Sequence, residues 1–266
     1  MSPLARRVLV WGLLAVQSAP VAGHEIKVFS SRHTLPEGGG KATVYLSWGH
    51  RLPVDELVDA TPVERYDLVA PDGTATALKK EGMSLQENVV EFKAAGVHSV
   101  VVTRKPSVYT YVLGEEGDRQ LKRGPKTEHP PEKVESGTRY LQAGKALIVV
   151  GKPGDTVPKP LGLPVEISPL DGPAKWVVGK DVRFQITLDG KPVPVADVQA
   201  RSVGFKPDDA WCYATESDRK GEFTIRPDRA GTWVLKVTVK KLTKGKTRDE
   251  YDFEASTATL VLEVQP

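Results

Sequence analysis

Two histidines carry the candidate chemistry of this 266-residue sequence. His24 lies in "VAGHEIKV" (21–28), just past an apolar run, and His50 closes the segment "ATVYLSWGH" (42–50). If the chain is cut after Gly23, His24 becomes the first residue and carries a free α-amine beside its imidazole. An amine and an imidazole on one residue chelate a metal in a single ordering event, and a second imidazole completes a three-nitrogen set that suits Cu(II) or Ni(II). The residues alone leave two interpretations open, a metal site and a merely structural pair.

Acidic residues follow His50 closely enough to add oxygen ligands. The segment "HRLPVDELVDA" (50–60) carries Asp55, Glu56 and Asp59. Oxygen ligands would widen the choice of metal toward Co(II) or zinc. We expect Asp55 to complete the site, and Glu56 and Asp59 to lie in a solvated acidic turn.

The other histidines and the single cysteine are weaker candidates. His98 opens the segment "HSVVVTR" (98–104), where it is either a strand-edge residue or a further metal ligand. We expect His33 and His129 in loops, and Cys212 half-buried on a strand with no histidine near it in sequence to activate its thiol. The chain has no HExxH, CxxC or G-x-S-x-G motif, and we expect a protein that is not an enzyme.

The first 23 residues have the pattern of an export signal. Arg6 and Arg7 precede the apolar run "VLVWGLLAV" (8–16), which is too short to span a bilayer. Small residues then end the segment at Gly23, a good processing site for signal peptidase. We therefore expect residues 1–23 to be removed and the mature protein to be periplasmic or secreted. A retained N-terminal anchor is the alternative.

Charge and cysteine content argue against a nucleic-acid-binding protein and against a fold held by disulfide bonds. The 37 basic and 34 acidic residues nearly balance, so the chain makes no attractive field for nucleic acid. An exported chain with one cysteine forms no intramolecular disulfide, so packing must hold the fold.

Short apolar segments bounded by Gly, Pro or Asp recur along the whole chain, which predicts an all-β fold. We expect two β-sandwich domains of Ig-like or Greek-key type in tandem. The segment 53–63 could hold one helical turn. The expected strands lie within 42–50, 98–106, 145–151, 182–190, 195–203, 221–227, 231–241 and 257–264.

Two polar stretches organise these strands. The segment 115–139 is charged and proline-rich and is expected as a mobile loop, and 151–164 has the composition of an extended connector. The predicted domains are a metal-binding sandwich over 24–158 and an Ig-like or transthyretin-like sandwich over 159–266. In the second domain, the Asp-Gly pair in "LDGKPVPVADVQA" (188–200) predicts a tight hairpin turn.

The order of several motifs resembles a large family of exported bacterial proteins. These are "AGHEIKV", "SWGHRLPVDELVDATPVERYDLVAPDG", "YLQAGKALIVVG" with "LGLPVEISPLDGP", and "VGKDVRFQITLDGKPVPVADVQA" with "ESDRKGEFTIRPDRAGTWVLKV" and "YDFEASTATLVLEV". The family is named for a domain of unknown function and includes periplasmic components of nickel and cobalt transport systems.

The resemblance implies a two-domain β protein that binds Ni(II) or Co(II), with Cu(II) next, and supplies or buffers the metal for an inner-membrane permease. His24 corresponds to the N-terminal histidine of the mature family members, and His50 to the histidine of the Gly-His motif. A tandem-sandwich adhesion or scaffold protein without metal is the main alternative. An oxidative copper enzyme is the last, since copper monooxygenases also use an N-terminal histidine with a second histidine.

Overall fold

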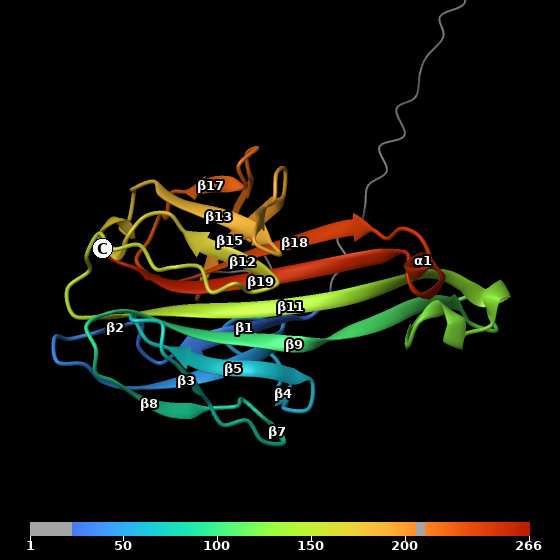
Figure 1. Ribbon diagram of the computed structural model, residues 1–266, viewed down its shortest axis with the longest axis horizontal. Helices are drawn as coiled ribbons and strands as arrows, with labels where there is room; N and C mark the ends of the chain where they lie inside the picture. The colour runs from blue at the N-terminus through green and yellow to red at the C-terminus, as the bar shows by residue number, and fades with distance from the viewer. Residues whose placement is uncertain (1–22, 206–210) are drawn as a thin grey trace, which may run out of the picture.

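The strands stack in three layers (Figure 1). The computed structural model describes residues 23–205 and 211–266, so the expected signal peptide lies outside the described residues except for Gly23. Within the described part nearly all regular structure is β-strand, which confirms the predicted fold class. The helical elements there are α1 (Thr247–Glu250) and short 3-10 turns at Lys126–Glu128, Pro131–Lys133 and Pro173–Lys175. No helix in these residues is long and apolar enough to cross a bilayer.

The middle layer is a ten-stranded sheet that draws strands from both halves of the chain. Its central strands, β11 (Val134–Val150) and β19 (Phe253–Val264), run parallel from Thr138 opposite Phe253 to Ala146 opposite Val261. In sheet order the strands are β16 (Tyr213–Glu216), β15 (Asp197–Ser202), β18 (Gly231–Leu242), β19 (Phe253–Val264), β11 (Val134–Val150), β9 (Gly96–Leu113), β5 (Val63–Val69) and β6 (Ala75–Ala77). Two further strands, β10 (Arg119–Arg123) and β2 (Thr34–Leu35), pair with β9 and β11.

One outer layer covers each face of the middle sheet. The N-terminal layer consists of β1 (Glu25–Ser30), β3 (Gly40–Gly49) and β8 (Asn88–Phe92), and the C-terminal layer of β12 (Val165–Pro169), β13 (Val182–Leu188), β14 (Lys191–Pro192) and β17 (Glu222–Ile225). Because successive side chains of a strand point to opposite faces, β11 contributes to both cores. Ala146 and Ile148 pack in the N-terminal core, and Leu147 and Val149 pack in the C-terminal core.

The two predicted sandwiches are therefore fused through a common sheet. Besides the shared strands, a buried ion pair joins the middle sheet to the C-terminal layer, with Lys145 Nζ 2.5 Å from Glu166 Oε1. The Glu166 carboxylate also accepts the backbone N–H groups of Leu161 and Leu163, which belong to the expected connector 151–164. The connector is thus fastened at its end to the buried charge pair.

The Asp-Gly turn lies where the sequence predicts it. Asp189 and Gly190 have φ values of 51° and 73°, and Leu188 pairs directly with Lys191 across the turn. Positive φ at both central residues is the requirement of a type I′ hairpin, which Asp-Gly meets at low cost.

The segment 115–139 is ordered differently from the expected mobile loop. It contains β10, and β11 already begins at Val134. The guanidinium of Arg119 lies 3.7 Å from the Tyr111 ring centre of β9 and 2.6 Å from Glu135 Oε2 of β11, and these contacts join β10 to both strands. Charged residues therefore build the end of a long hairpin, which extends beyond β1 and β3 (Figure 1).

The helical turn considered for 53–63 does not form. The segment instead contains β4 (Val58–Asp59), which pairs with β7 (Met83–Ser84), and an isolated bridge between Trp48 and Glu56. The backbone N–H groups that a helix would satisfy internally are bonded across strands here, such as Glu56 N to Trp48 O at 2.9 Å.

Candidate functional site

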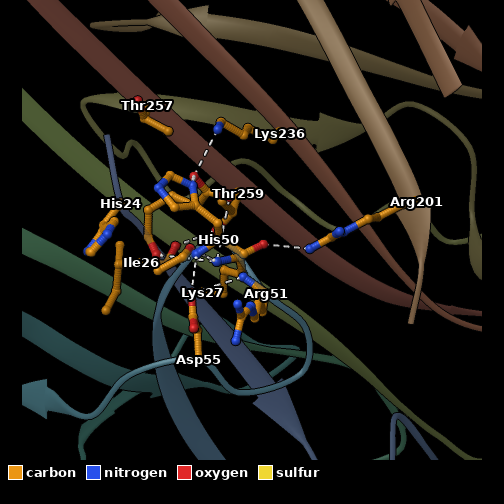
Figure 2. Close-up of polar contacts among 12 residues, drawn as sticks. His24, Ile26, Lys27, His50, Arg51, Asp55, Arg201, Lys236, Thr257 and Thr259 are labelled. Carbon is orange, nitrogen blue, oxygen red and sulfur yellow. Dashed lines mark hydrogen bonds and ion pairs between the residues drawn. The ribbon is translucent and has the colours of Figure 1, made fainter. Parts of the chain in front are cut away.

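The pairing of β1 with β3 brings His24 and His50 together. In this antiparallel ladder Glu25 lies opposite Gly49, so His24 precedes one strand where His50 follows the other. The two imidazole rings meet edge to face, with centroids 4.8 Å apart and an interplanar angle of 82° (Figure 2). The expectation that these histidines meet at one end of a sandwich agrees with this geometry.

Asp55 holds the turn that presents His50. Its Oδ2 atom accepts the backbone N–H groups of His50 and Arg51 at 2.7 and 3.1 Å (Figure 2). These two hydrogen bonds keep the pKa of Asp55 below its ordinary value. Gly49 adopts a φ of +113°, which side-chain-bearing residues rarely adopt. The residue expected as an oxygen ligand thus has its Oδ2 engaged by the backbone.

Glu56 is the acid that faces the histidine pair. Its Oε2 atom lies 3.6 Å from His24 Nδ1, and the Trp48 ring centre lies 5.8 Å from that of His24. The bridge between Trp48 and Glu56 places this carboxylate, which the sequence pattern had assigned to a solvated turn. With its side chain about half exposed (52%), Glu56 retains the freedom to rotate toward a ligand.

A buried group of charges lies beneath the histidines. Glu25 is 1% exposed, and its Oε2 lies 2.8 Å from Lys236 Nζ and 3.9 Å from His50 Nδ1. Lys27, which is fully buried, lies 3.5 Å from Glu25 Oε1 and donates a hydrogen bond to Gly49 O. Burial lowers the pKa of Lys27 to about 8, an effect that the charge of Glu25 opposes. The carboxylate of Glu25 is therefore the common partner of three basic groups.

The middle sheet also holds the backbone of the histidine pair. Arg201 Nη2 donates to His50 O at 2.6 Å, and Gln142 Nε2 donates to His24 O at 2.7 Å. Thr259 Oγ1 donates to Ile26 O at 2.7 Å. Sequence reasoning missed these contacts. The one available signal was "EIKV" (25–28), where opposite charges alternate with apolar residues on a strand.

His98 lies apart from the pair. It lies six positions along β9 from Arg104, which is on the order of 20 Å at the rise of a strand, and Arg104 is the β9 residue that contacts Trp48. His98 Nε2 lies 2.8 Å from Ala94 O, and the ring packs at right angles on Phe92. The structure therefore does not bring this candidate ligand to the site.

The remaining candidates lie in separate surroundings. His33 is buried, with Nδ1 2.9 Å from Leu147 O and Nε2 without a partner among the described residues. His129 follows the 3-10 turn at Lys126–Glu128, in the loop region where it was expected. Cys212 is half-buried as expected, but it lies in the bend just before β16 rather than on a strand, and its Sγ lies 3.5 Å from Ala200 O.

The side chains alone form no complete metal site. Across residues 23–205 and 211–266, no group of three or more His, Cys, Asp and Glu side chains is arranged to hold a metal ion. The histidine pair thus offers two imidazoles, and the backbone nitrogen of His24 is a peptide nitrogen as long as Gly23 precedes it. Cleavage at that bond would convert this nitrogen into an amine donor.

A family model described as a domain of unknown function (DUF4198) matches residues 21–241. The chain belongs to the DUF4198 family. The DUF4198 match includes both histidines, the turn held by Asp55 and the basic residues Arg201 and Lys236. It therefore spans nearly all of the site described above.

Comparison with other proteins adds no functional argument for this DUF4198 member. No curated protein matches the chain. An elastase-activated α2-macroglobulin of Escherichia coli is 11% identical with a TM-score of 0.24, and the match covers 92% of this chain and 20% of that one. The D00-D0 domain of intimin is 11% identical with a TM-score of 0.20, covering 89% and 98% of the two chains. The chain thus spans about a fifth of the macroglobulin's length, and such low TM-scores carry no inference.

Proposed function

We propose that the mature protein, beginning at His24, binds a transition-metal ion outside the cytoplasm and acts as a non-enzymatic accessory component of metal uptake. The observation that supports this proposal best is the edge-to-face contact of His24 and His50 at the end of β1, with centroids 4.8 Å apart. Ni(II) or Co(II) is the proposed cargo on the family resemblance, and Cu(II) is the alternative. An inner-membrane permease is the proposed recipient.

The donor set fits such an ion only after cleavage. His24 would contribute its α-amine and Nδ1, and His50 a ring nitrogen. A three-nitrogen set leaves further coordination positions open, and it suits the later divalent metals of the first transition row. Glu56, with Oε2 3.6 Å from His24 Nδ1, is the oxygen donor proposed in place of Asp55, whose Oδ2 binds backbone N–H groups.

The carboxylate of Glu25 is placed to fix the orientation and the tautomer of the His50 ring. A metal-bound histidine commonly donates its second ring N–H to a carboxylate, which sets the tautomer. Glu25 Oε2 lies 3.9 Å from His50 Nδ1, close enough to take this role after a small rotation. His50 Nε2 is then the nitrogen proposed to bind the metal, and Glu25 a positioning residue behind it.

The test is calorimetric titration of metal-free mature protein with Ni(II), Co(II) and Cu(II). We expect tight binding that is lost when one alanine is added before His24, because this addition moves the free amine off the histidine. The His50→Ala variant should bind at least about tenfold more weakly, equivalent to roughly 1.4 kcal/mol. His129→Ala, a loop histidine remote in sequence from the pair, is the control and should bind as the wild type does.

Each alternative predicts its own result. Equal binding by the alanine-extended protein would refute the amine chelate. Flat traces with all three ions would favour a scaffold or adhesion role without metal. Selectivity must be judged against the intrinsic order of affinities, in which Cu(II) binds most tightly to almost any nitrogen site.

A further inference from the structure

Arg104 is a half-buried cation without an ion-pair or hydrogen-bond partner among the described residues. Its Cζ atom lies 3.6 Å from the centre of the Trp48 ring, a stacking contact that fixes the guanidinium plane but leaves the edge donors unused. Burial is the main cause that lowers the pKa of Arg104 from its ordinary value. The charges of Tyr109 and Asp59 oppose this effect, but no described group makes an ion pair or hydrogen bond with the guanidinium, so its edge donors are available to an anion.

A hollow of about 310 Å³ opens beside this guanidinium. Trp48 and Arg104 form part of its wall, and the exposed side chain of Met83 lies at its rim. The hollow adjoins the histidine pair, because Trp48 contacts His24 with ring centroids 5.8 Å apart and Glu56 lines the same space. It is large enough for a small organic molecule.

The two acids that line the hollow have other contacts. Asp59 Oδ1 accepts the backbone N–H of Thr61 at 2.9 Å. Hydrogen bonds from Thr61 are the main cause that lowers the pKa of Asp59, and the charge of Arg104 adds to this effect. Glu56 Oε2 faces His24. Neither carboxylate lies within ion-pair distance of Arg104 in the described structure. Glu56 thus lies toward His24, while the charge of Asp59 acts on Arg104 from beyond ion-pair distance.

We propose that this hollow binds a small carboxylate chelator that reaches the metal at His24 and His50, with one carboxylate held by Arg104. The inference rests on the proposed metal site and names the form in which the ion is bound. A carboxylate chelator would give Arg104 a negatively charged partner. Its other oxygen atoms would occupy coordination positions that three nitrogen donors leave open on the metal. Arginine holds a carboxylate through two parallel N–H···O bonds, which lysine cannot reproduce.

The experiment is equilibrium dialysis of the mature protein against radiolabelled citrate, with and without Ni(II). We expect the protein to retain citrate in proportion to bound Ni(II). Arg104→Gln should weaken citrate retention at least about tenfold, because it removes a charge-assisted bidentate pair, while calorimetry with citrate-free Ni(II) stays near the wild-type value. Arg219→Gln, in an exposed turn of the C-terminal half, is the matched control.

The outcomes separate the two proposals. If Ni(II) binds but citrate is not retained, the carboxylate site is refuted and the metal site stands. If Ni(II) does not bind, the metal site itself fails. Equal citrate retention with and without metal, or by Arg104→Gln and the wild type, also overturns the inference. Arg104→Lys keeps a cation over Trp48, so an intermediate loss in this variant, with an unchanged circular dichroism spectrum, rules out misfolding as the cause.

Discussion

Acid should destabilise the fold through His33, and replacing this residue by asparagine should remove that part of the effect. The His33 ring is fully enclosed, and its Nδ1 donates to Leu147 O at 2.9 Å. Nε2 has no partner among the described residues, so a second proton there would place a charge in the core without an acceptor. Burial accordingly lowers the pKa of His33 from 6.5 to about 4.

The magnitude follows from this difference. The unfolded chain takes up the proton at higher pH than the folded chain, so the contribution of neutral His33 is complete above pH 6.5 and falls as the pH drops toward 4. Each pKa unit corresponds to about 1.4 kcal/mol, so the loss should approach about 2 kcal/mol at pH 5 and about 3 kcal/mol at pH 4. This is a large share of the roughly 5–15 kcal/mol that keeps a domain folded.

Urea unfolding at pH 7.5 and pH 5 measures the effect. In His33→Asn the side-chain amide can still donate to Leu147 O, but the residue cannot take up a proton. The wild type should lose about 2 kcal/mol more than His33→Asn between the two pH values. His98, whose pKa burial also lowers, is present in both proteins and cancels in the comparison. Equal losses by the two proteins would refute the reasoning.

Two further substitutions test the buried ion pair between the middle sheet and the C-terminal layer, and the turn that presents His50. Glu166→Gln should cost about 3–5 kcal/mol in urea unfolding, because it leaves Lys145 charged and buried without a counter-ion, and pairing it with Lys145→Met should recover most of this loss. Gly49→Ala should weaken Ni(II) binding to the mature protein in calorimetry, because the new Cβ would collide with the Asp55 carboxylate that holds His50. Wild-type affinity in Gly49→Ala would show that this turn does not matter.

Local patterns in the sequence predict the strands well. Apolar and β-branched segments such as 182–190 and 257–264 coincide with β13 and β19, and the Asp189-Gly190 turn follows from backbone preferences alone. The parallel pairing of β11 with β19 is different, because it joins segments more than a hundred residues apart and leaves no local trace. For this reason the sequence suggested two separate sandwiches where the structure has a shared sheet.

In the site, too, the contacts between residues close in the chain could be predicted from the sequence, and those between distant residues could not. The contact of His24 with His50 follows from a short antiparallel pair, which the sequence allowed. The choice between Asp55 and Glu56 depends on which carboxylate caps a turn, and an aspartate that binds backbone N–H groups nearby in sequence is a common solution that the pattern also permitted. The roles of Lys236 and Arg201 could not be inferred, since both reach the site from strands of the other half.

The shared sheet has a consequence for the order in which this protein can assemble. Thr259 of β19 bonds to Ile26 across 233 positions of the chain, and Lys236 of β18 pairs with Glu25 across 211. Strand β1 is made early but lacks its neighbours in the middle sheet until strands made far later have folded back. Bringing together strands so far apart in the chain costs conformational entropy before the contacts between them can form, and such steps of folding are slow. The contacts of Glu25 and Ile26 with the middle sheet, which lie beneath the histidine pair, should therefore be among the last to form, although β1 and β3 themselves are neighbours in the chain.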